Sequence, residues 1–352
     1  MHKILITGNL GYIGPVLTNY LKKKYKKKIS ITGLDNGYFK NFKSDVYSFE
    51  KNSVDIQIYE DLRSFKLSNI VKYDSIVLLA AISNDPIGNS FIKQTYDINI
   101  KSNLKLIKEA IKKNVKNIVF AGSCSIYGNS GHLNKKSKKE NDELNPLTPY
   151  AISKVEIEKK VKLSDLKNTV FTSLRFATAC GVSSSLRLDL ALNEMVWSSV
   201  TKKQIKLQSD GSQFRPLIDV SDMCRAIDWA VFRKKNNGGK KLEVNVGNNK
   251  SNIRIIDIAN KIKSILPKTK ILKKNKAYVD KRSYKVDFKR YYDLAKNHRP
   301  KKNLDTTIKE LAKYIKNNKF SNEYEFEFYL KRLNLLNEKI RKKILNKNLD
   351  YL

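Results

Sequence analysis

The chain has 352 residues, of which 41% are apolar and 10% aromatic, so it is long enough for a real core and too apolar for wholesale disorder. Its formal net charge of +36 would suit a nucleic-acid binder, but the excess is mostly lysine, is spread along the chain and lacks interleaved aromatic residues, so no nucleic-acid partner is expected. No apolar run reaches the roughly 18 residues of a membrane span, and no charged-then-apolar leader opens the sequence, so we expect a cytoplasmic protein.

The first half of the chain alternates short apolar runs, which predict β-strands, with longer segments that have helical patterns. The predicted strands comprise residues 3–7, 29–34, 54–59, 75–80, 117–121 and 169–175. The main helical segments comprise residues 12–24, 91–113 and 149–163. This alternation is typical of βαβ units, and it predicts an α/β fold with a doubly wound parallel sheet and helices on both faces.

The pattern changes after residue 176. Helices are predicted at residues 186–200, 221–233 and 253–265, and short strands at 205–208 and 243–246. We therefore expect an N-terminal sheet domain at 1–175, a smaller mixed α/β substrate lobe at 176–320 with segments that return to the main sheet, and a helical extension at 321–352. That extension would cap the small lobe or meet another subunit.

The first predicted strand runs directly into a turn that contains Gly8, Gly11 and Gly14, and a helix follows. Glycines at this spacing permit a tight turn, close approach of the backbone to a pyrophosphate and close packing of the helix on the strand. The helix N-terminus then offers free N–H groups and the positive end of its dipole to the phosphates. This context predicts a dinucleotide-binding Rossmann fold, whose turn also includes Tyr12 and Ile13.

Asp35 follows the second predicted strand, about 20 residues beyond the glycine turn, where a carboxylate can accept hydrogen bonds from the hydroxyl groups of the adenine-linked ribose. A carboxylate there repels a 2′-phosphate, so the predicted cofactor is NAD rather than NADP. Lys40 and Lys43 are near enough in the sequence to leave NADP open.

Tyr150 and Lys154 lie four residues apart in a predicted helix, which puts both side chains on one helix face. A tyrosine with a pKa of about 10 is a poor base at neutral pH, but a nearby lysine and an oxidised nicotinamide favour the phenolate, so we expect the pKa of Tyr150 to fall. Tyr20 and Lys24 share the spacing but belong to an amphipathic surface helix. Ser123 ends a parallel strand at the edge where open α/β sheets bind ligands, and it can hydrogen-bond the reacting oxygen.

The three cysteines, Cys124, Cys180 and Cys224, are far apart in the sequence. They lack the Cys-x-x-Cys spacing of many metal sites, and their number is odd. We expect reduced thiols, with no disulfide framework and no bound metal.

Together these features resemble the extended short-chain dehydrogenase/reductase family, in its NAD-dependent nucleotide-sugar epimerase/dehydratase group. The resemblance continues through Gln-Phe-Arg-Pro at 213–216, Asp-Val-Ser-Asp at 219–222, Asn-Val-Gly at 245–247 and Asp-Lys-Arg-Ser-Tyr at 280–284. It runs in order from residue 3 to about residue 318. It departs from the family at Leu78, where histidine is frequent, and at Thr178, where asparagine is frequent.

The resemblance implies that Tyr150 is the base, that Lys154 orients the nicotinamide ribose and lowers the tyrosine pKa, and that Ser123 assists at the substrate oxygen. The implied cofactor-binding positions are Gly8, Gly11, Tyr12, Ile13, Gly14, Asp35, Asn36, Asp61, Leu62, Leu79, Ala80, Ala81, Asn99, Tyr150 and Lys154. The implied substrate-binding positions are Ser83, Ser123, Thr178, Asn193, Arg215 and Arg282, of which the two arginines would meet the substrate pyrophosphate. A surface position is the alternative left open for Arg175 and Arg187.

The reaction implied by the resemblance is NAD-dependent epimerisation of a nucleotide sugar, with C4 as the expected carbon and a transient 4-keto sugar. Family dehydratases carry an Asp-Glu pair after the catalytic hydroxyl residue, whereas Cys124 and Ser125 stand here, so the groups for water elimination are missing. A nucleotide-sugar 4-dehydrogenase or 4-ketosugar reductase is the alternative, and a non-catalytic Rossmann protein that binds NAD or RNA is a remote one. Family members often dimerise through two helices, here expected at 91–113 and 149–163, so a homodimer is predicted.

Overall fold

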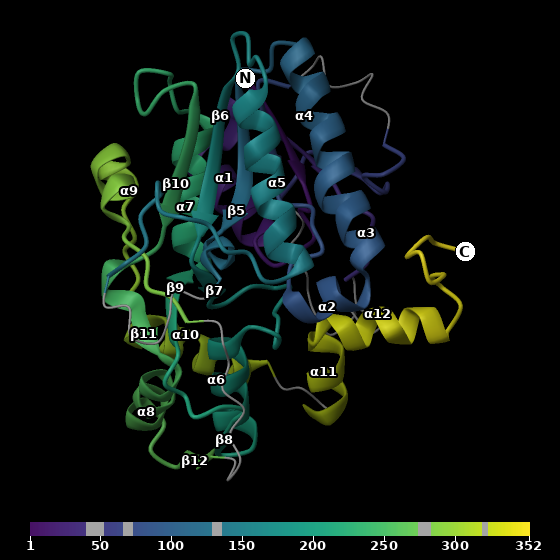
Figure 1. The fold of residues 1–352 in the computed structure, drawn as a ribbon. Coiled ribbons are helices and arrows are strands. Elements are labelled where there is room, and N and C mark those ends of the chain that lie inside the picture. The colour runs from purple at the N-terminus through teal and green to yellow at the C-terminus, as the bar shows by residue number, and fades with distance from the viewer. Residues whose placement is uncertain (40–52, 66–72, 129–135, 274–282, 319–322) are drawn as a thin grey trace.

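The computed structural model describes residues 1–39, 53–65, 73–128, 136–273, 283–318 and 323–352, and the structural statements below concern these residues. Its centre is a parallel seven-stranded sheet with the order β10-β6-β5-β4-β1-β2-β3 (Figure 1). The strands are β1 (His2–Thr7), β2 (Ile29–Leu34), β3 (Ile56–Ile58), β4 (Ser75–Leu78), β5 (Asn117–Ser123), β6 (Val170–Phe176) and β10 (Lys241–Val246). The strand order reverses between β1 and β4, and open α/β sheets bind ligands beyond the carboxyl ends of the strands at such a switch point.

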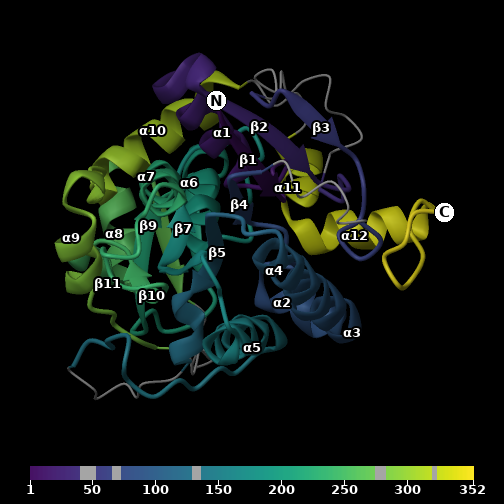
Figure 2. The same cartoon turned by 90° about the horizontal axis from the view of Figure 1, so that it is seen from above.

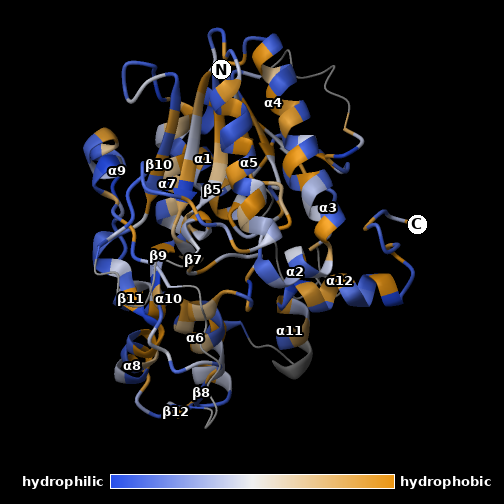
Figure 3. Cartoon of the chain, in the orientation of Figure 1, coloured by the Kyte–Doolittle hydropathy of each residue, from blue (hydrophilic) through white to orange (hydrophobic). Residues whose placement is uncertain are grey.

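The sheet strands are apolar along their length because helices cover both faces of the sheet. In β1, Ile4 and Ile6 pack into the hydrophobic cluster that contains Leu17, whereas the intervening Leu5 packs into the cluster on the opposite face that contains Leu106. The colouring of Figure 3 shows mostly orange strands between helices that carry both orange and blue residues. The predicted doubly wound parallel sheet is confirmed.

Two helix layers flank the sheet. Helices α1 (Gly14–Tyr25) and α7 (Val220–Val231) lie on one face, and α4 (Asn103–Lys112) and α5 (Pro149–Leu163) lie on the other (Figure 2). The second layer begins with α2 (Asp85–Ser90), α3 (Ile92–Tyr96) and a π-helical turn at Asp97–Ser102, which continues directly into α4. The single helix predicted at 91–113 is therefore interrupted by a π-turn.

Helix α5 begins where local chemistry favours a start. The Thr148 side chain accepts a hydrogen bond from the Ala151 N–H, and Pro149 occupies the first turn, where its missing N–H carries no penalty. This start fixes the position of the helix face that carries Tyr150 and Lys154.

The second half forms a smaller lobe with its own apolar core around the fully buried Trp197. Its helices are α6 (Ala191–Thr201), α8 (Ile255–Ile265) and α10 (Leu304–Asn317). Its strands form two small sheets, β11 (Asn252–Arg254) with β9 (Phe214–Asp219) and β7 (Thr178–Cys180), and β12 (Lys270–Lys273) with β8 (Gln204–Leu207). Helices α7 and α9 (Lys289–Leu294) and strand β10 pack with the main sheet, and the short 3₁₀ turns are Lys26–Lys28, Cys124–Tyr127, Asn249–Ser251 and Lys296–His298.

The helix predicted at 186–200 begins later than expected, at Ala191. The chain from 186 to 190 is irregular; there the Arg187 guanidinium pairs with the Asp189 carboxylate, and the Leu188 N–H donates to the Leu330 carbonyl at 3.0 Å. This irregular segment borders the pocket described below.

The chain ends in helices α11 (Glu323–Leu330) and α12 (Arg332–Arg341) and a short tail. Phe326 and Leu330 of α11 join the core of the small lobe, as one of the two expected placements required. Helix α12 turns away from that lobe and lies beside the loops that follow β2 and β4 (Figures 1 and 2). Among the described helices, none is both long and apolar enough to span a membrane.

Candidate active site

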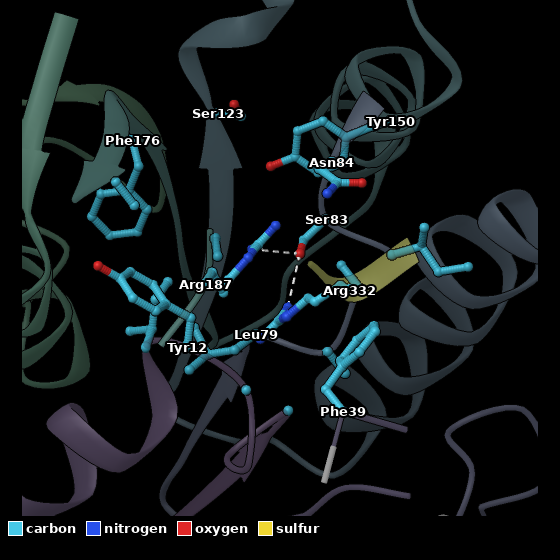
Figure 4. Close-up of a pocket in the computed structure, with 18 of the residues that line it drawn as sticks. Tyr12, Phe39, Leu79, Ser83, Asn84, Ser123, Tyr150, Phe176, Arg187 and Arg332 are labelled. Atoms are coloured by element: carbon cyan, nitrogen blue, oxygen red, sulfur yellow. Dashed lines mark hydrogen bonds between the residues drawn. The ribbon is translucent and has the colours of Figure 1, made fainter. Parts of the chain in front are cut away.

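A cavity of about 430 Å³ opens along the carboxyl edge of the main sheet and extends toward the small lobe (Figure 4). It brings most of the predicted site residues together, although they come from positions 8 to 215 of the sequence. The predicted residues that line it are Gly8, Gly11, Tyr12, Ile13, Asp35, Asn36, Asp61, Leu62, Leu79, Ala80, Ala81, Ser83, Ser123, Tyr150, Lys154, Thr178 and Arg215. Arg282, and the Lys40 and Lys43 that left NADP open, lie outside the described residues.

The glycine turn is built for close packing. Gly8 has a φ of +75°, and a Cβ there would lie 2.5 Å from the Ala80 nitrogen. A Cβ at Gly14 would lie 2.1 Å from the Asn9 carbonyl oxygen, so this glycine serves the packing of turn and helix and does not line the cavity. Helix α1 begins after Ile13 without a side-chain cap, which leaves its first N–H groups for a phosphate beside Gly11.

Asp35 lines the cavity directly after the end of β2. Its carboxylate accepts hydrogen bonds from the N–H groups of Leu10 at 3.1 Å and Gly37 at 2.7 Å. Burial raises the pKa of Asp35, and these two N–H groups oppose the rise. The turn and this carboxylate together form a cradle whose shape and donors fit a dinucleotide.

The predicted adenine contact Asp61 is held by several side chains. Its carboxylate accepts hydrogen bonds from Asn36 at 2.9 Å and Tyr38 at 2.8 Å, and it pairs with Arg63 at 2.9 Å. These donors lower the pKa of Asp61 despite its partial burial. Asn36 thus orients the acid as well as lining the cavity.

Tyr150 and Lys154 occupy successive turns of α5 and both face the cavity. The Lys154 ammonium lies 5.5 Å from the centre of the Tyr150 ring and 4.7 Å from that of Phe120. Burial raises the pKa of Tyr150, with an opposing contribution from a hydrogen bond to Ser123. Burial also lowers the pKa of Lys154 to about 7, with Glu158 opposing.

The expected fall of the Tyr150 pKa does not occur in the protein alone. Desolvation of a phenolate outweighs the hydrogen bond from Ser123, and Lys154 is itself desolvated. Arg187 also lowers the pKa of Tyr150, but in the protein alone this does not offset burial.

Two predicted residues lie behind the cavity wall. Asn99, in the π-helical turn, accepts a hydrogen bond from the Ile82 N–H at 2.8 Å and donates to the Ile82 carbonyl and to Ser153, so it ties the loop after β4 to α5. Asn193 accepts from the Gly181 N–H at 3.0 Å and donates to the Tyr12 hydroxyl. Neither side chain reaches the cavity, so their direct contact with cofactor or substrate is not supported.

A surface position is wrong for both Arg175 and Arg187. Arg175 is buried under the sheet edge, where it pairs with Glu158 at 2.8 Å. Arg187 lines the cavity, pairs with Asp189 at 2.6 Å and donates to the Ser83 hydroxyl at 3.0 Å. The Arg-Leu-Asp sequence at 187–189 was the only sequence signal for the ion pair between Arg187 and Asp189. It was missed because a helix was predicted over these residues.

Arg332 of α12 is a cavity residue that the sequence did not indicate. Figure 4 shows Arg187 and Arg332 converging on the Ser83 hydroxyl, to which Arg332 donates at 3.3 Å. The Arg332 guanidinium also lies 4.2 Å from the centre of the Phe39 ring. No motif marks it, because it belongs to a segment beyond the family resemblance.

The positions that carry acids in family dehydratases face different ways. Cys124 is buried and its thiol contacts the Arg175 carbonyl at 3.1 Å, whereas Ser125 lines the cavity. Two carboxylates on the cavity wall have side-chain partners: Asp85 accepts a hydrogen bond from Thr148 at 2.6 Å, and Asp189 pairs with Arg187 at 2.6 Å.

Comparisons with known proteins agree with this geometry. The profile described as the NAD dependent epimerase/dehydratase family matches residues 4–247. A UDP-glucose 4-epimerase of Lactobacillus helveticus is 25% identical over 283 residues, which cover 75% of this chain and 82% of the relative. A UDP-glucuronic acid 4-epimerase from Bacillus cereus, solved with UDP-glucuronic acid and NAD, superimposes with a TM-score of 0.74 at 24% identity over 90% of this chain and 99% of that one. An NAD-dependent NDP-hexosamine 5,6-dehydratase of tunicamycin biosynthesis superimposes with a TM-score of 0.76 at 18% identity, covering 92% and 100%, and at such identities the likeness establishes the fold alone.

Proposed function

The chain belongs to the NAD-dependent epimerase/dehydratase family, and on that premise we propose that it is a nucleotide-sugar epimerase that acts at C4 through a transient 4-keto sugar. The observation that carries the proposal is the meeting of the glycine turn, Ser123, Tyr150 and Lys154 in one cavity that continues toward the small lobe. The cofactor is NAD, and the cradle of Gly8, Gly11 and Asp35 fits it.

When bound, NAD would accept the hydride, its reduced form would return it, and the oxidised nicotinamide would add positive charge to the site. Tyr150 takes the proton from the sugar hydroxyl and returns it after the ketone has turned its other face to the cofactor. Ser123 donates to the same oxygen, and Lys154 holds the cofactor ribose. Because burial raises the pKa of Tyr150, the phenol stays protonated in the empty site, and with NAD bound it would release that proton to solvent before it accepts the proton of the sugar hydroxyl.

The surroundings of Tyr150 favour epimerisation over dehydration. Elimination of water needs a free acid and base near the sugar. Cys124 points into the core, and the nearby Asp85 and Asp189 are tied to Thr148 and Arg187. A ketone formed here therefore has hydride return as its most accessible fate.

The substrate half of the cavity is basic, as a nucleotide diphosphate requires. Arg215 on β9 and Arg187 on the irregular segment before α6 line it, together with Thr178. Guanidinium groups bind diphosphates through charge-assisted hydrogen bonds. A UDP-sugar, the substrate class named for the Lactobacillus and Bacillus relatives, is our first choice.

The decisive experiment is to incubate the purified protein with UDP-, GDP-, dTDP- and CDP-sugars without added cofactor. The proposal expects the C4 isomer to form with no net absorbance change from NADH. Stoichiometric accumulation of NADH would instead identify a 4-dehydrogenase, and conversion of a supplied 4-keto sugar by NADH alone a reductase. Conversion of no sugar nucleotide by a protein that binds NAD would overturn the proposal.

We further propose a homodimer built from α3, α4 and α5. These helices form one outer layer, and Ile92 and Leu163 on them are strongly exposed apolar residues. Analytical ultracentrifugation measures the expected doubling of mass. A cytoplasmic location stays a prediction, which fractionation of the source cells tests.

A further inference from the structure

The last 30 residues form what we term the C-terminal arm, residues 323–352. The arm lies outside the family match, which ends at residue 247. Its helix α12 and tail lie beside the loops after β2, β3 and β4, at the same edge of the sheet as Asp35 and the glycine turn. Helix α12 and the tail therefore cover the cofactor end of the cavity, whereas α11 packs into the small lobe.

The arm is fastened to that edge by polar and apolar contacts. Arg63, after β3, donates to the carbonyls of Asn348 and Leu349 at 2.8 Å each. Lys339 donates to the Gly37 carbonyl at 3.2 Å, two residues beyond Asp35. Beneath these bonds, a separate hydrophobic cluster contains Leu336, Leu345 and Leu349 of the arm together with Tyr38, Ile82, Ile87 and Ile98 of the sheet domain.

Arg332 is the arm residue that enters the cavity. Only 6% of its surface is exposed, and one terminal nitrogen, Nη2, has no hydrogen-bond partner among the described residues. A Cβ built on Gly11 would lie 3.7 Å from that nitrogen. The unused N–H groups therefore lie beside the turn that forms the phosphate cradle.

The charge of Arg332 is also incompletely balanced within the protein. Burial and the nearby Arg187 lower the pKa of Arg332 to about 9, although Asp189 and Asp35 oppose the shift. A buried guanidinium with unsatisfied donors is strongly unfavourable unless an anion meets it. The anion expected between Gly11 and Asp35 is the diphosphate that joins the two halves of NAD.

We propose that Arg332 binds the pyrophosphate of NAD and that the C-terminal arm closes the adenosine end of the pocket, so that the cofactor stays bound between turnovers. The inference rests on NAD as the cofactor and not on the choice of sugar reaction. Arg332 would thus add a charged side chain to a phosphate site in which the glycine turn provides backbone N–H groups. Retention suits an enzyme that returns its hydride to each product.

The test measures nucleotide binding directly, on protein freed of co-purified nucleotide. Arg332→Met keeps an unbranched apolar stem, is shorter than arginine, and removes the charge and the donors. Because charge-assisted hydrogen bonds to buried ions contribute about 1.5–3 kcal/mol, we expect NAD and ADP to bind about ten- to hundredfold more weakly, and adenosine to bind as in the wild type. A chase with unlabelled NAD should show correspondingly faster release of labelled NAD.

Arg341→Met is the matched control, because Arg341 lies on the same helix, is exposed and pairs with Glu338. It should leave binding and release unchanged. Arg332→Lys should recover part of the ADP affinity because it restores the charge without the planar donors. If Arg332→Met does not fold, the comparison of Arg332→Lys with Arg341→Lys decides in its place.

Wild-type ADP affinity in a folded Arg332→Met protein would overturn the proposal, as would equal losses for ADP and adenosine. A loss confined to the nucleotide sugar would assign Arg332 to the substrate and overturn it as well. These outcomes are separate from the epimerase assay, since a protein that binds NAD but converts no sugar can still give the expected Arg332 result.

Discussion

The two walls of the cavity are built by different means. The motif wall, formed by Gly8, Asp35, Ser123, Tyr150 and Lys154, stands on the carboxyl ends of parallel strands and the first turns of α5. The assembled wall, formed by Arg187, Arg215 and Arg332, comes from an irregular segment, a small sheet and the C-terminal arm.

The difference separates two kinds of information in the chain. Backbone geometry fixes the motif wall, since a turn, a strand end and a helix face each place their residues over short sequence distances. Tertiary packing fixes the assembled wall, whose arginines are isolated in sequence. On this division, we propose that the motif wall carries the chemistry and that the assembled wall carries substrate choice and cofactor retention.

The largest expected effect breaks the chemistry and leaves binding intact. Tyr150→Phe removes the hydroxyl that exchanges the proton, so turnover should fall about a hundred- to ten-thousandfold. NAD affinity, measured by calorimetry, should stay within twofold of the wild type. Tyr20→Phe, in a tyrosine–lysine pair with the same spacing but outside the cavity, is the control. Near-wild-type turnover of Tyr150→Phe would remove the assigned base.

The second effect concerns the stability that the protein loses by burying Lys154 in the motif wall. Lys154 is buried, and its pKa is lowered from 10.5 to about 7, so the unfolded chain binds the proton more tightly than the folded one. Lys154→Met should therefore raise the free energy of unfolding by about 2–4 kcal/mol below pH 7, and the gain should shrink as the pH rises toward 10.5.

Urea unfolding of wild type and Lys154→Met at pH 6 and pH 9 measures that difference. Lys159→Met, on the exposed side of the same helix, is the matched control. An equal difference in the free energy of unfolding at both pH values would show that folding does not lower the pKa of Lys154.

The third effect tests the backbone of the motif wall. Gly8→Ala places a Cβ at a positive φ and 2.5 Å from the Ala80 nitrogen, so the free energy of unfolding should fall by about 2–3 kcal/mol. Gly239→Ala is matched in φ, at +89°, but its nearest contact is the Lys241 carbonyl oxygen at 3.7 Å. Its smaller loss isolates conformational strain from the clash, and identical losses would show that the close approach to Ala80 is unimportant.

The smallest effect sharpens the role of the assembled wall. Arg215→Met should raise the KM for the nucleotide sugar about tenfold, by loss of a charged contact to its diphosphate, with little change in NAD affinity. Arg254→Met, on the exposed neighbouring strand β11, is the control. A change in NAD affinity with an unchanged KM would show that Arg215 contacts the cofactor and not the substrate.

The same division explains what the sequence could predict. The strand 29–34 and the helix 149–163 match β2 and α5 at both ends, because a buried apolar run and a Thr-Pro start are local signals. The residues of the motif wall met in one cavity as expected. In the protein alone, burial raises the pKa of Tyr150, since desolvation depends on the whole fold, whereas the predicted fall also required an oxidised nicotinamide.

Other features escaped prediction because they depend on distant partners. Arg187 lay within a segment whose apolar pattern suggested a helix, but the helix begins at Ala191 and Arg187 pairs with Asp189 before it. Asn193 was expected at the substrate, but its amide is used up in joining Gly181 to Tyr12. Nothing local to Arg332 indicated that α12 would carry it to the glycine turn.

The buried state of the cysteines has a practical consequence for following the C-terminal arm. Cys124, Cys180 and Cys224 are buried, and burial raises the pKa of each thiol, so maleimide dyes should react with them slowly. A single cysteine introduced at the exposed Asn337 on α12 would then accept a fluorophore without replacement of any native cysteine. Energy transfer from that label to a dye on NAD would test whether the arm stays over the cofactor while NAD is bound.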